Sequence, residues 1–476
     1  MACFFVYKQE FGHKKAKEYI VNREQSCIST SRVVWGQAQA KGTEPLGGIF
    51  MIGIRNVIAI VCGGGPAPGI NSVISGITNE ASRHGWDVIG IYDGFSRLAR
   101  GEKNYLRLEP KNISHIHMTG GCILKMSRYN PTKKESDMRT VVETLTELGV
   151  THLVTIGGDD TAYSSAAVAE YARKMGRTIN VVHVPKTIDN DLPLPDGVPT
   201  FGFETARAFA TTEIENLMED ARTTNNRWYF TIAMGRTAGH LALGMGRSAG
   251  AALTIIPEEL PVQVPLQHVV DIITGSIVKR YLTGKNYGVA VIAEGIIEKI
   301  APEDFEKLGT VVKDEHGHIR YSELDFGEIL KQAVLAETKK LGIKLSIIDK
   351  EIGYELRCTS PIAYDIDYAR SLGYEAVQFL MRGDSGALIT IQDNKAVPLR
   401  FEDIKDPATG KTKVRKVNIN SVHYKIARGS MMRLEKEDLD DPGLANAYHM
   451  TQDEFRKRYA YLFEAPDQAP AKAAKK

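Results

Sequence analysis

The sequence predicts an α/β protein whose parallel sheets are connected by crossover helices. Two observations predict this fold class. Short apolar runs of β type alternate with longer segments of helical pattern from about residue 55 onward. Five of those runs lead into segments that contain glycines, acids or bases, and ligands of open α/β sheets bind at the carboxyl ends of the strands. The chain has 476 residues, which allows two or three domains of roughly 150 residues each.

Each strand-like run leads into a short segment that can carry chemistry. The first three lead into GGGPAPG (63–69), GGDDT (157–161) and PKTIDND (185–191), the fourth into MGR (234–236) and the fifth into Glu294. We therefore expect strands at Asn56–Cys62, His152–Ile156, Val181–Val184, Tyr229–Ala233 and Gly288–Ala293, and a helix over Asn71–His84.

Composition and charge exclude several classes of protein. Hydrophobic residues make up 43% and charged residues 25%, which excludes a fibrous or wholly disordered chain. Sixty Lys and Arg against 58 Asp and Glu give a net charge of +2, so no bulk charge draws the chain to nucleic acid or acidic membranes. The five cysteines are scattered and never spaced C-x-x-C, which argues against a disulfide framework or a zinc site. We expect reduced thiols in a cytoplasmic, soluble protein.

The two ends of the sequence differ from the middle. Residues 1–54 show no clear period and are expected to form an N-terminal extension, without the apolar core of a signal peptide. Residues 465–476 form a low-complexity segment that predicts a disordered tail. The apolar stretch Leu46–Cys62 is interrupted by Arg55 and Asn56 and is too short to span a bilayer.

The glycine loops predict an anion site. In GGGPAPG, glycines let backbone N–H groups approach a phosphate, and the following helix adds its dipole. The alternative is that the glycines only make a tight bend. GGDDT adds two acids, which fits Mg²⁺ held beside a phosphate. The alternative for Asp159 and Asp160 is helix N-capping, which aspartate favours.

The segment TIDND (187–191) is the most suggestive. Two carboxylates two residues apart at a strand end can accept a proton from an attacking hydroxyl, and Lys186 can neutralise charge on a phosphoryl group in transfer. The alternative is an Asx-turn, in which Asp and Asn bond their own backbone. Arg227 and Arg236 are cations of a type that binds phosphate, although a single arginine is usually a surface or ion-pair residue.

Other catalytic motifs are missing or coincidental. Asp325-Phe326-Gly327 matches the DFG of protein kinases, but no His-Arg-Asp loop accompanies it. No Walker-type loop, dinucleotide fingerprint or His-Glu-x-x-His pattern occurs. These classes are therefore not expected.

Taken in order along the chain, these segments resemble the phosphofructokinase family closely, over roughly residues 55–460. The combination of PKTIDND with MGR is highly specific. The matching pieces are GGGPAPGIN (63–71), IGIYDGF (89–95), GGCILKMSR (120–128), GGDDT (157–161), PKTIDND (185–191), Arg227, MGR (234–236), AEG (293–295) and GYELR (353–357).

The resemblance implies two Rossmann-like three-layer domains with parallel sheets and an active site in the cleft between them. It implies a phosphoryl-donor-binding domain over residues 55–200 and 356–405. A sugar-phosphate-binding domain would then take residues 201–355 and 406–464. The implied reaction is phosphoryl transfer to the C1 hydroxyl of fructose 6-phosphate, a step of glycolysis and gluconeogenesis.

The resemblance also implies roles for individual residues. Asp189 is the proton acceptor, and Asp159 holds Mg²⁺, the expected cofactor. Arg227 crosses a subunit interface, which implies a homodimer or homotetramer. The implied catalytic set is Asp189, Lys186, Asp191 and Arg236; the donor-binding set is Gly64, Arg128, Gly158, Asp160, Thr161 and Lys186; and the substrate-binding set is Thr187, Asp189, Arg227, Met234, Gly235, Arg236, Glu294, Tyr354 and Arg357.

Two residues predict the phosphoryl donor. ATP-using members of the bacterial type look like GGDG and PGTID where this chain has Asp160 and Lys186, a pair that resembles the pyrophosphate-dependent branch. A carboxylate at 160 would stand where the α-phosphate of ATP must pass. Two unit charges about 4 Å apart repel by roughly 4 kcal/mol at an effective dielectric near 20, which is about a thousandfold in affinity. Some ATP-dependent members carry the lysine but look like GGDG, so Asp160 decides for pyrophosphate.

Three departures from the family pattern affect the implied pockets. Pro66 replaces a common aspartate in the first loop, and Tyr354 stands where many members have histidine. The second cross-subunit arginine of the bacterial type aligns with Ile348, for which Lys344 or Lys350 would substitute. The open alternatives are an ATP-dependent enzyme on the same fold, activity on sedoheptulose 7-phosphate, and a non-catalytic subunit that binds sugar phosphate.

Overall fold

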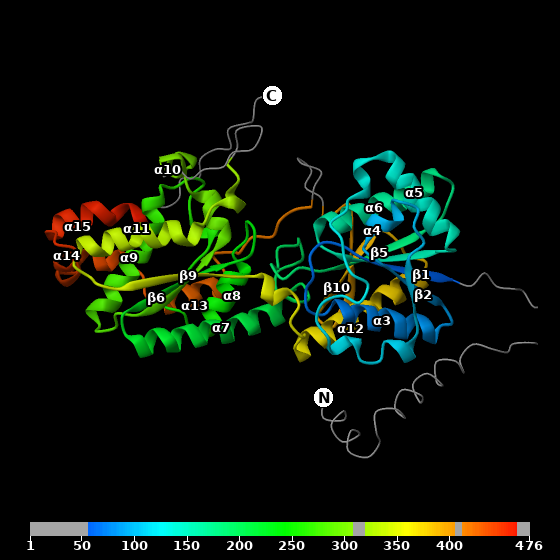
Figure 1. Cartoon of the computed structure of the whole chain (residues 1–476), viewed down its shortest axis with the longest axis horizontal. Helices are drawn as coiled ribbons and strands as arrows, with labels where there is room; N and C mark the ends of the chain where they lie inside the picture. The colour runs from blue at the N-terminus through cyan, green and yellow to red at the C-terminus, as the bar shows by residue number, and fades with distance from the viewer. Residues whose placement is uncertain (1–55, 308–318, 405–411, 464–476) are drawn as a thin grey trace, which may run out of the picture. The chain divides into compact units, whose positions relative to one another are not determined.

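The computed structural model describes residues 56–307, 319–404 and 412–463; the expected N-terminal extension (1–54) and C-terminal tail (465–476) lie outside this range. Within it, two sheets organise the helices (Figure 1). The first has seven strands in the order β11-β10-β5-β4-β1-β2-β3, and the second has four in the order β7-β8-β6-β9. None of the described helices is both long and apolar enough to cross a membrane.

The first sheet is parallel in its interior and antiparallel at both edges. The expectation of parallel sheets is therefore right for the interior and wrong at the edges. The β10–β11 edge is a hairpin. Its two turn residues, Asp393 and Asn394, both adopt positive φ, of 48° and 60°, as tight hairpin turns require. Its strands are β1 (Val57–Cys62), β2 (Asp87–Ile91), β3 (Tyr105–Leu108), β4 (His152–Gly157), β5 (Asn180–Pro185), β10 (Ala387–Gln392) and β11 (Lys395–Arg400).

Helices cover both faces of the first sheet, because its central strands are apolar on both sides. In β1, Ile58 and Ile60 pack against α3 and α12, whereas Ala59 and Val61 pack against α4, α5 and α6. Figure 1 shows these two helix layers on opposite sides of the sheet. The helices are α3 (Ile70–Arg83), α4 (Phe95–Leu98), α5 (Glu135–Glu147), α6 (Asp159–Lys174) and α12 (Ala363–Met381).

The second sheet is parallel throughout. Figure 1 shows α7 on one side of β6 and β9 and α11 on the other. The strands are β6 (Arg227–Ala233), β7 (Leu253–Ile255), β8 (Gly288–Ala293) and β9 (Ser346–Ile352). The helices are α7 (Phe203–Thr224), α8 (His240–Ala249), α9 (Leu266–Leu282), α10 (Pro302–Lys307), α11 (Phe326–Lys340), α13 (Val422–Ser430), α14 (Pro442–Ala447) and α15 (Gln452–Tyr459).

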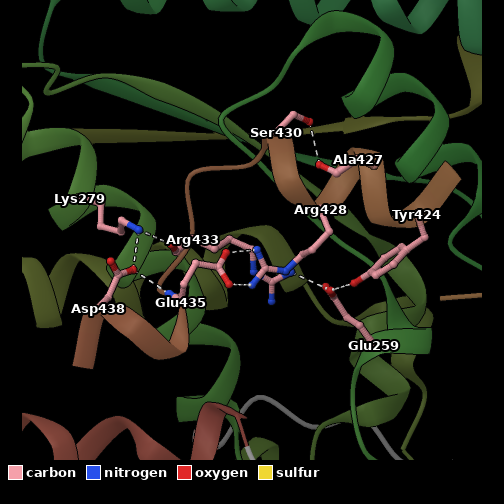
Figure 2. Close-up of polar contacts among 9 residues, drawn as sticks. All are labelled: Glu259, Lys279, Tyr424, Ala427, Arg428, Ser430, Arg433, Glu435 and Asp438. Carbon is pink, nitrogen blue, oxygen red and sulfur yellow. Dashed lines mark hydrogen bonds and ion pairs between the residues drawn. The ribbon is translucent and has the colours of Figure 1, made fainter. Parts of the chain in front are cut away.

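Two ion pairs, one buried and one half-buried, connect the last part of the chain to elements around the second sheet (Figure 2). Arg433 donates to Glu259 at 2.7 Å, and both side chains are only 9% exposed. Lys279 on α9 pairs with Asp438 at 2.5 Å. The segment that follows β11 is therefore tied to elements more than 150 residues earlier in the sequence, beside the 3-10 turn Pro257–Glu259.

The five predicted strands are confirmed, and their boundaries shift by two residues at most. The predicted first helix begins one residue earlier than expected, at Ile70, and ends at Arg83. The predicted domain boundaries remain a prediction.

Candidate active site

The ends of neighbouring parallel strands lie in register, and this brings their loops together. In the first sheet Cys62 pairs with Ile156, and Gly157 with Pro185, so the loops after β1, β4 and β5 start at one edge. In the second sheet Ala233 pairs with both Ala293 and Ile352. Met234, Glu294 and Gly353 therefore leave that sheet side by side. Every segment predicted to carry chemistry leaves one of these two edges or lies beside it.

Glycines allow the first two loops to pack tightly around one side chain. Thr161 is buried, and a Cβ atom on Gly63 or Gly157 would lie 2.3 or 2.4 Å from its side-chain atoms. Only glycine fits at such distances. Gly64 adopts φ +83°, and a Cβ atom there would lie 3.4 Å from Nζ of Lys186. The glycines therefore do more than make a bend, because they bring the loop backbone against Thr161 and Lys186.

The acids of GGDDT begin helix α6 but do not cap it. The N-cap residue is Gly158, and it makes no side-chain cap bond. Asp159 and Asp160 are the first two helical residues, so the N-capping interpretation is wrong. Asp159 instead reaches across to the second sheet's loop, where its Oδ1 lies 3.8 Å from Nη1 of Arg236. Asp160 is exposed.

Lys186 is buried at the centre of this arrangement. Lys186 is only 6% exposed, and its Nζ donates to the carbonyl oxygen of Gly65 at 2.5 Å. Burial lowers the pKa of Lys186 to about 8, and the charge of Asp189 acts in the opposite direction. The ammonium group is therefore held against the backbone of the first glycine loop.

Asp189 has the properties of a proton acceptor. The residue is 8% exposed, and its Oδ1 atom has no hydrogen-bond partner in the described structure. Burial raises the pKa of Asp189 to about 6; the Asp191 carboxylate raises it further, and Arg236 opposes both. The chain turns at TIDND as expected, but the Asp189 side chain does not hold the turn. Thr187 Oγ1 accepts a hydrogen bond from the Asp189 N–H at 3.0 Å instead. The carboxylate itself is therefore left free for chemistry.

Arg236 and Glu294 connect the loops of the second sheet. Arg236 adopts φ 50°, and its N–H donates to Oε1 of Glu294 at 2.9 Å. Burial acts to lower the pKa of Arg236, but the carboxylates of Asp159, Asp191 and Asp189 raise it above its ordinary value. Its guanidinium therefore lies near the acids of two loops of the first sheet, those that follow β4 and β5.

Two further predicted residues approach the first glycine loop. A Cβ atom on Gly65 would lie 3.6 Å from the guanidinium carbon of Arg357 and 3.8 Å from Nη2 of Arg128. Arg357 also lies 4.7 Å from the ring centroid of Tyr354, which is 73% exposed. These cations add positive charge around a loop that already presents backbone amides.

Arg227 is not brought to this site. It begins β6, whereas Met234 follows the strand's other end, about 20 Å away at 3.3 Å per residue. In this chain Arg227 donates to Asp220 at 2.7 Å. The residues considered for the second cross-subunit arginine, Ile348, Lys344 and Lys350, are all exposed on or just before β9.

The carboxylates of Asp159 and Asp191 fit a divalent cation. Burial raises the pKa of Asp191, and the nearby charge of Asp159 raises it further. A cation between them would relieve that repulsion, and Mg²⁺ typically takes one or two carboxylates together with substrate phosphates. No cluster of three or more acidic, His or Cys ligands occurs among the described residues. The two cavities of about 350 and 590 Å³ beside α11 include no residue of the glycine loops, of TIDND or of MGR, although Lys350 lines the first.

Sequence reasoning missed Arg415, which makes several hydrogen bonds to TIDND and to the residues that follow it. Arg415 donates to backbone carbonyls of Asn190, Leu194, Pro195 and Val198. It lies in a stretch with no periodic pattern and is separated from the loop by more than 200 residues. No signal in the sequence indicated this contact.

Comparison with known proteins gives a consistent picture. A family model described as Phosphofructokinase matches residues 57–380. The chain is 51% identical over 419 residues to a pyrophosphate–fructose 6-phosphate 1-phosphotransferase of Thermotoga maritima, covering 86% of this chain and 99% of the relative. It is 46% identical over 422 residues to a protein of the same name from Naegleria fowleri, covering 86% and 96%.

A solved structure supports the fold. The structure of a pyrophosphate-dependent phosphofructokinase from Marinobacter aquaeolei aligns with a TM-score of 0.60 and 18% identity, covering 83% of this chain and 92% of the other. At that identity the likeness concerns the fold alone.

Proposed function

The chain belongs to the phosphofructokinase family, and on that premise we propose that it transfers a phosphoryl group from pyrophosphate to the C1 hydroxyl of fructose 6-phosphate. The products are fructose 1,6-bisphosphate and phosphate. The observation that carries the proposal is the pair formed by a free, buried Asp189 carboxylate and the buried Lys186 ammonium beside the glycine loop. Both close relatives are named for this reaction.

The proposed mechanism assigns one task to each group. Asp189 accepts the proton of the C1 hydroxyl as that oxygen attacks the terminal phosphorus. Lys186 and Arg236 neutralise the charge on the phosphoryl oxygens in transfer. Both cations are close enough to Asp189 to interact with it electrostatically. The backbone amides after β1 and at the start of α6 bind the diphosphate. Since phosphate is the leaving group, the reaction is expected to be readily reversible.

The metal and the partners belong to the same proposal. Mg²⁺ held by Asp159 would supply neutralisation of the diphosphate charge. Gly64, Arg128, Gly158, Asp160 and Thr161 complete the donor side, with Thr161 acting by packing since its side chain is buried between glycines. The sugar phosphate would contact Thr187, Met234, Gly235, Glu294, Tyr354 and Arg357. A homo-oligomer acting in the cytoplasm, with Arg227 serving a neighbouring subunit, fits the free thiols and the position of Arg227.

Asp160 supports pyrophosphate over ATP. It is exposed in the first turn of α6, beside Asp159 and within the electrostatic reach of Arg236. In the proposed binding mode a bare diphosphate would end before this carboxylate, whereas the α-phosphate of a nucleotide would meet it. The negative charge of Asp160 therefore excludes the nucleotide and leaves the diphosphate site intact.

A donor comparison tests the proposal. The purified protein is assayed with fructose 6-phosphate and Mg²⁺, with pyrophosphate or ATP as donor. We expect turnover with pyrophosphate and little with ATP. Turnover with ATP alone would refute the donor assignment and favour the ATP-dependent enzyme. The absence of turnover with either donor would favour a non-catalytic subunit.

Two variants separate charge from space at position 160. Asp160→Asn removes the charge at constant size, and Asp160→Gly also removes the side chain. We expect the ratio of ATP to pyrophosphate activity to rise in both and to rise further in Asp160→Gly. Glu303→Gln, which neutralises an exposed acid in the first turn of α10, is the matched control and should leave the ratio unchanged.

A further inference from the structure

The loop that carries Asp189 is closed at its neck. Lys186 and Phe201 form a parallel bridge across it. Thr200 Oγ1 donates to the carbonyl of Thr187 at 2.7 Å. The loop between these contacts has no helix or strand of its own, so its carbonyl groups need partners from elsewhere.

One side chain supplies those partners. The Arg415 guanidinium donates to four carbonyl oxygens and to the Asn190 side chain. The distances are 2.7 Å to Val198, 2.9 Å from Nη2 and 3.1 Å from Nε to Asn190, 3.2 Å to Pro195 and 3.3 Å to Leu194. A planar fork of five donors suits such a set, and an ammonium group does not.

Arg415 also fixes the residue next to the proton acceptor. Asn190 stands between Asp189 and Asp191 with φ 55°, a left-handed backbone conformation that residues other than glycine rarely adopt. Its Oδ1 atom accepts from Arg415 and from the N–H of Thr200, the latter at 3.0 Å. The direction in which the chain presents Asp189 therefore depends on these bonds.

The three residues Arg415–Val417, which we call the strap, hold the Arg236 loop at the same time. The Arg415 N–H donates to the carbonyl of Asp191 at 2.8 Å, and Lys416 donates to the carbonyl of Thr237, the residue after Arg236. The Val417 N–H donates to Glu258 at 3.0 Å, and that carboxylate also accepts from the Gly239 N–H at 3.0 Å. The strap thus contacts both loops whose side chains flank the reacting groups.

Stability alone does not explain a charge at this position. Arg415 forms no ion pair in the described part of the chain; the carboxylates of Asp196 and Asp191 act on it only at longer range, and its hydrogen-bond partners are neutral oxygens. Removing a charge from water without a directly paired opposite charge is unfavourable compared with well-packed neutral residues. The arrangement instead gives geometric specificity to one loop.

We propose that Arg415 is a positioning residue for the phosphoryl transfer and that the strap fixes Asp189 relative to Arg236. This inference rests on the proposed function, because that function assigns the roles of Asp189 and Arg236. Arg415 itself contacts neither reacting atom; it acts through Asn190 and Asp191.

Kinetics of Arg415→Ala and Arg415→Lys test the inference. We expect kcat to fall about 10- to 100-fold, because a small misplacement of a reacting group has effects of that size. KM for pyrophosphate should stay within about threefold, since the donor loops are untouched. Guanidinium at low millimolar concentration should restore part of kcat in Arg415→Ala. Hydrogen exchange of the 187–200 amides should rise in both variants.

Arg280→Ala is the matched control. Arg280 is also half-buried and donates to a carbonyl, that of Tyr287, at 2.7 Å near the start of β8, the end of the strand opposite Glu294. It should lose stability without a comparable loss of kcat and without rescue. A kcat within about twofold of wild type in a folded Arg415 variant overturns the inference. So does a loss that guanidinium leaves unchanged while loop exchange stays at the wild-type level.

The outcomes separate the two proposals. If the wild-type protein uses ATP, the donor assignment fails, but the kcat loss can still be measured with ATP. If the wild-type protein has no activity, hydrogen exchange of the loop still tests the strap without any substrate. If Arg415→Ala does not fold, Arg415→Lys keeps the charge and decides the question.

Discussion

At the scale of single residues, Asp189 shows a conflict between folding stability and its proposed role as proton acceptor. Its carboxylate is buried with one oxygen unpartnered, and burial raises its pKa from 3.8 to about 6. A shift of that size corresponds to about 3 kcal/mol in favour of the protonated form. Because the pKa of the folded state is the higher one, this stabilisation is fully present below pH 3.8 and is lost as the pH rises through 6.

We therefore predict opposite effects of Asp189→Asn on stability and activity. At pH 7 the variant should melt at a higher temperature than wild type, and the difference should shrink towards pH 5, where wild-type Asp189 is mostly protonated. kcat should fall by about 10²- to 10⁴-fold through loss of the proposed proton acceptor. Thermal melts across pH 5–8, with steady-state assays, measure both. A difference in melting temperature that does not change with pH would contradict the assignment.

The pH dependence of kcat/KM should be bell-shaped. Asp189 must be deprotonated to accept a proton, and Lys186 must be protonated to neutralise phosphate charge. Burial sets their pKa values at about 6 and about 8 in the free enzyme, so activity should fall below the first and above the second. In Lys186→Arg the alkaline limb should move out of the measured range. An unchanged alkaline limb in that variant would assign it to another group.

The sequence predicted these two residues because charged side chains directly after an apolar strand are conspicuous. Their burial and their pKa values could not be predicted, since both depend on loops that come together only in the fold. Arg415 is the clearest omission. Its role depends on hydrogen bonds to the carbonyl groups of Asn190 and Val198. Every residue has a backbone carbonyl, so a sequence pattern cannot indicate which of them a distant arginine will contact.

At the scale of elements, the sequence was most informative where strands are buried on both faces. β1, β4, β5, β6 and β8 are short apolar runs that end in glycine, lysine, methionine or an acid, and their positions were predicted within two residues. The antiparallel edge strand β11 was not predicted. Its residues Lys395–Arg400 are all half-buried or exposed, so they lack the apolar run on which the predictions relied.

The contact of Gly63 and Gly157 with Thr161 makes a specific prediction about packing. In Gly63→Ala the new Cβ atom would lie 2.3 Å from Thr161 Oγ1 but 3.2 Å from its Cβ atom. We expect Gly63→Ala to lower the free energy of unfolding by about 1–3 kcal/mol, and Thr161→Ala to recover most of that loss in the double variant. Urea unfolding measures both.

Gly157→Ala is the control for that rescue. There the new Cβ atom would lie 2.4 Å from the Cβ atom of Thr161, which alanine retains. Thr161→Ala should therefore not recover the stability lost in Gly157→Ala. Equal recovery in the two double variants would show that the loops relax away from position 161 and that the close approach is not fixed.

At the scale of the whole molecule, the site depends on contacts between residues of the two sheets. Asp159 and Arg236 lie 3.8 Å apart although one follows β4 and the other follows β6. Arg227, by contrast, lies at the far end of β6 from Arg236. A single chain cannot place both arginines on one sugar phosphate, since about 20 Å separates the two ends of that strand.

A mixed oligomer therefore tests whether Arg227 serves a neighbouring site. Arg227→Ala and Asp189→Asn should each be nearly inactive alone. If Arg227 acts across the interface, a hybrid dimer has one complete site, built from Asp189 of one chain and Arg227 of the other. Random co-assembly of equal amounts gives about half hybrid dimers, so the unfractionated mixture should regain about one quarter of wild-type activity and the doubly tagged hybrids about one half. If Arg227 acts within its own chain, every site in the mixture lacks one of the two groups and no activity returns. Co-expression with two purification tags, followed by an activity assay of the doubly tagged fraction, distinguishes the two cases.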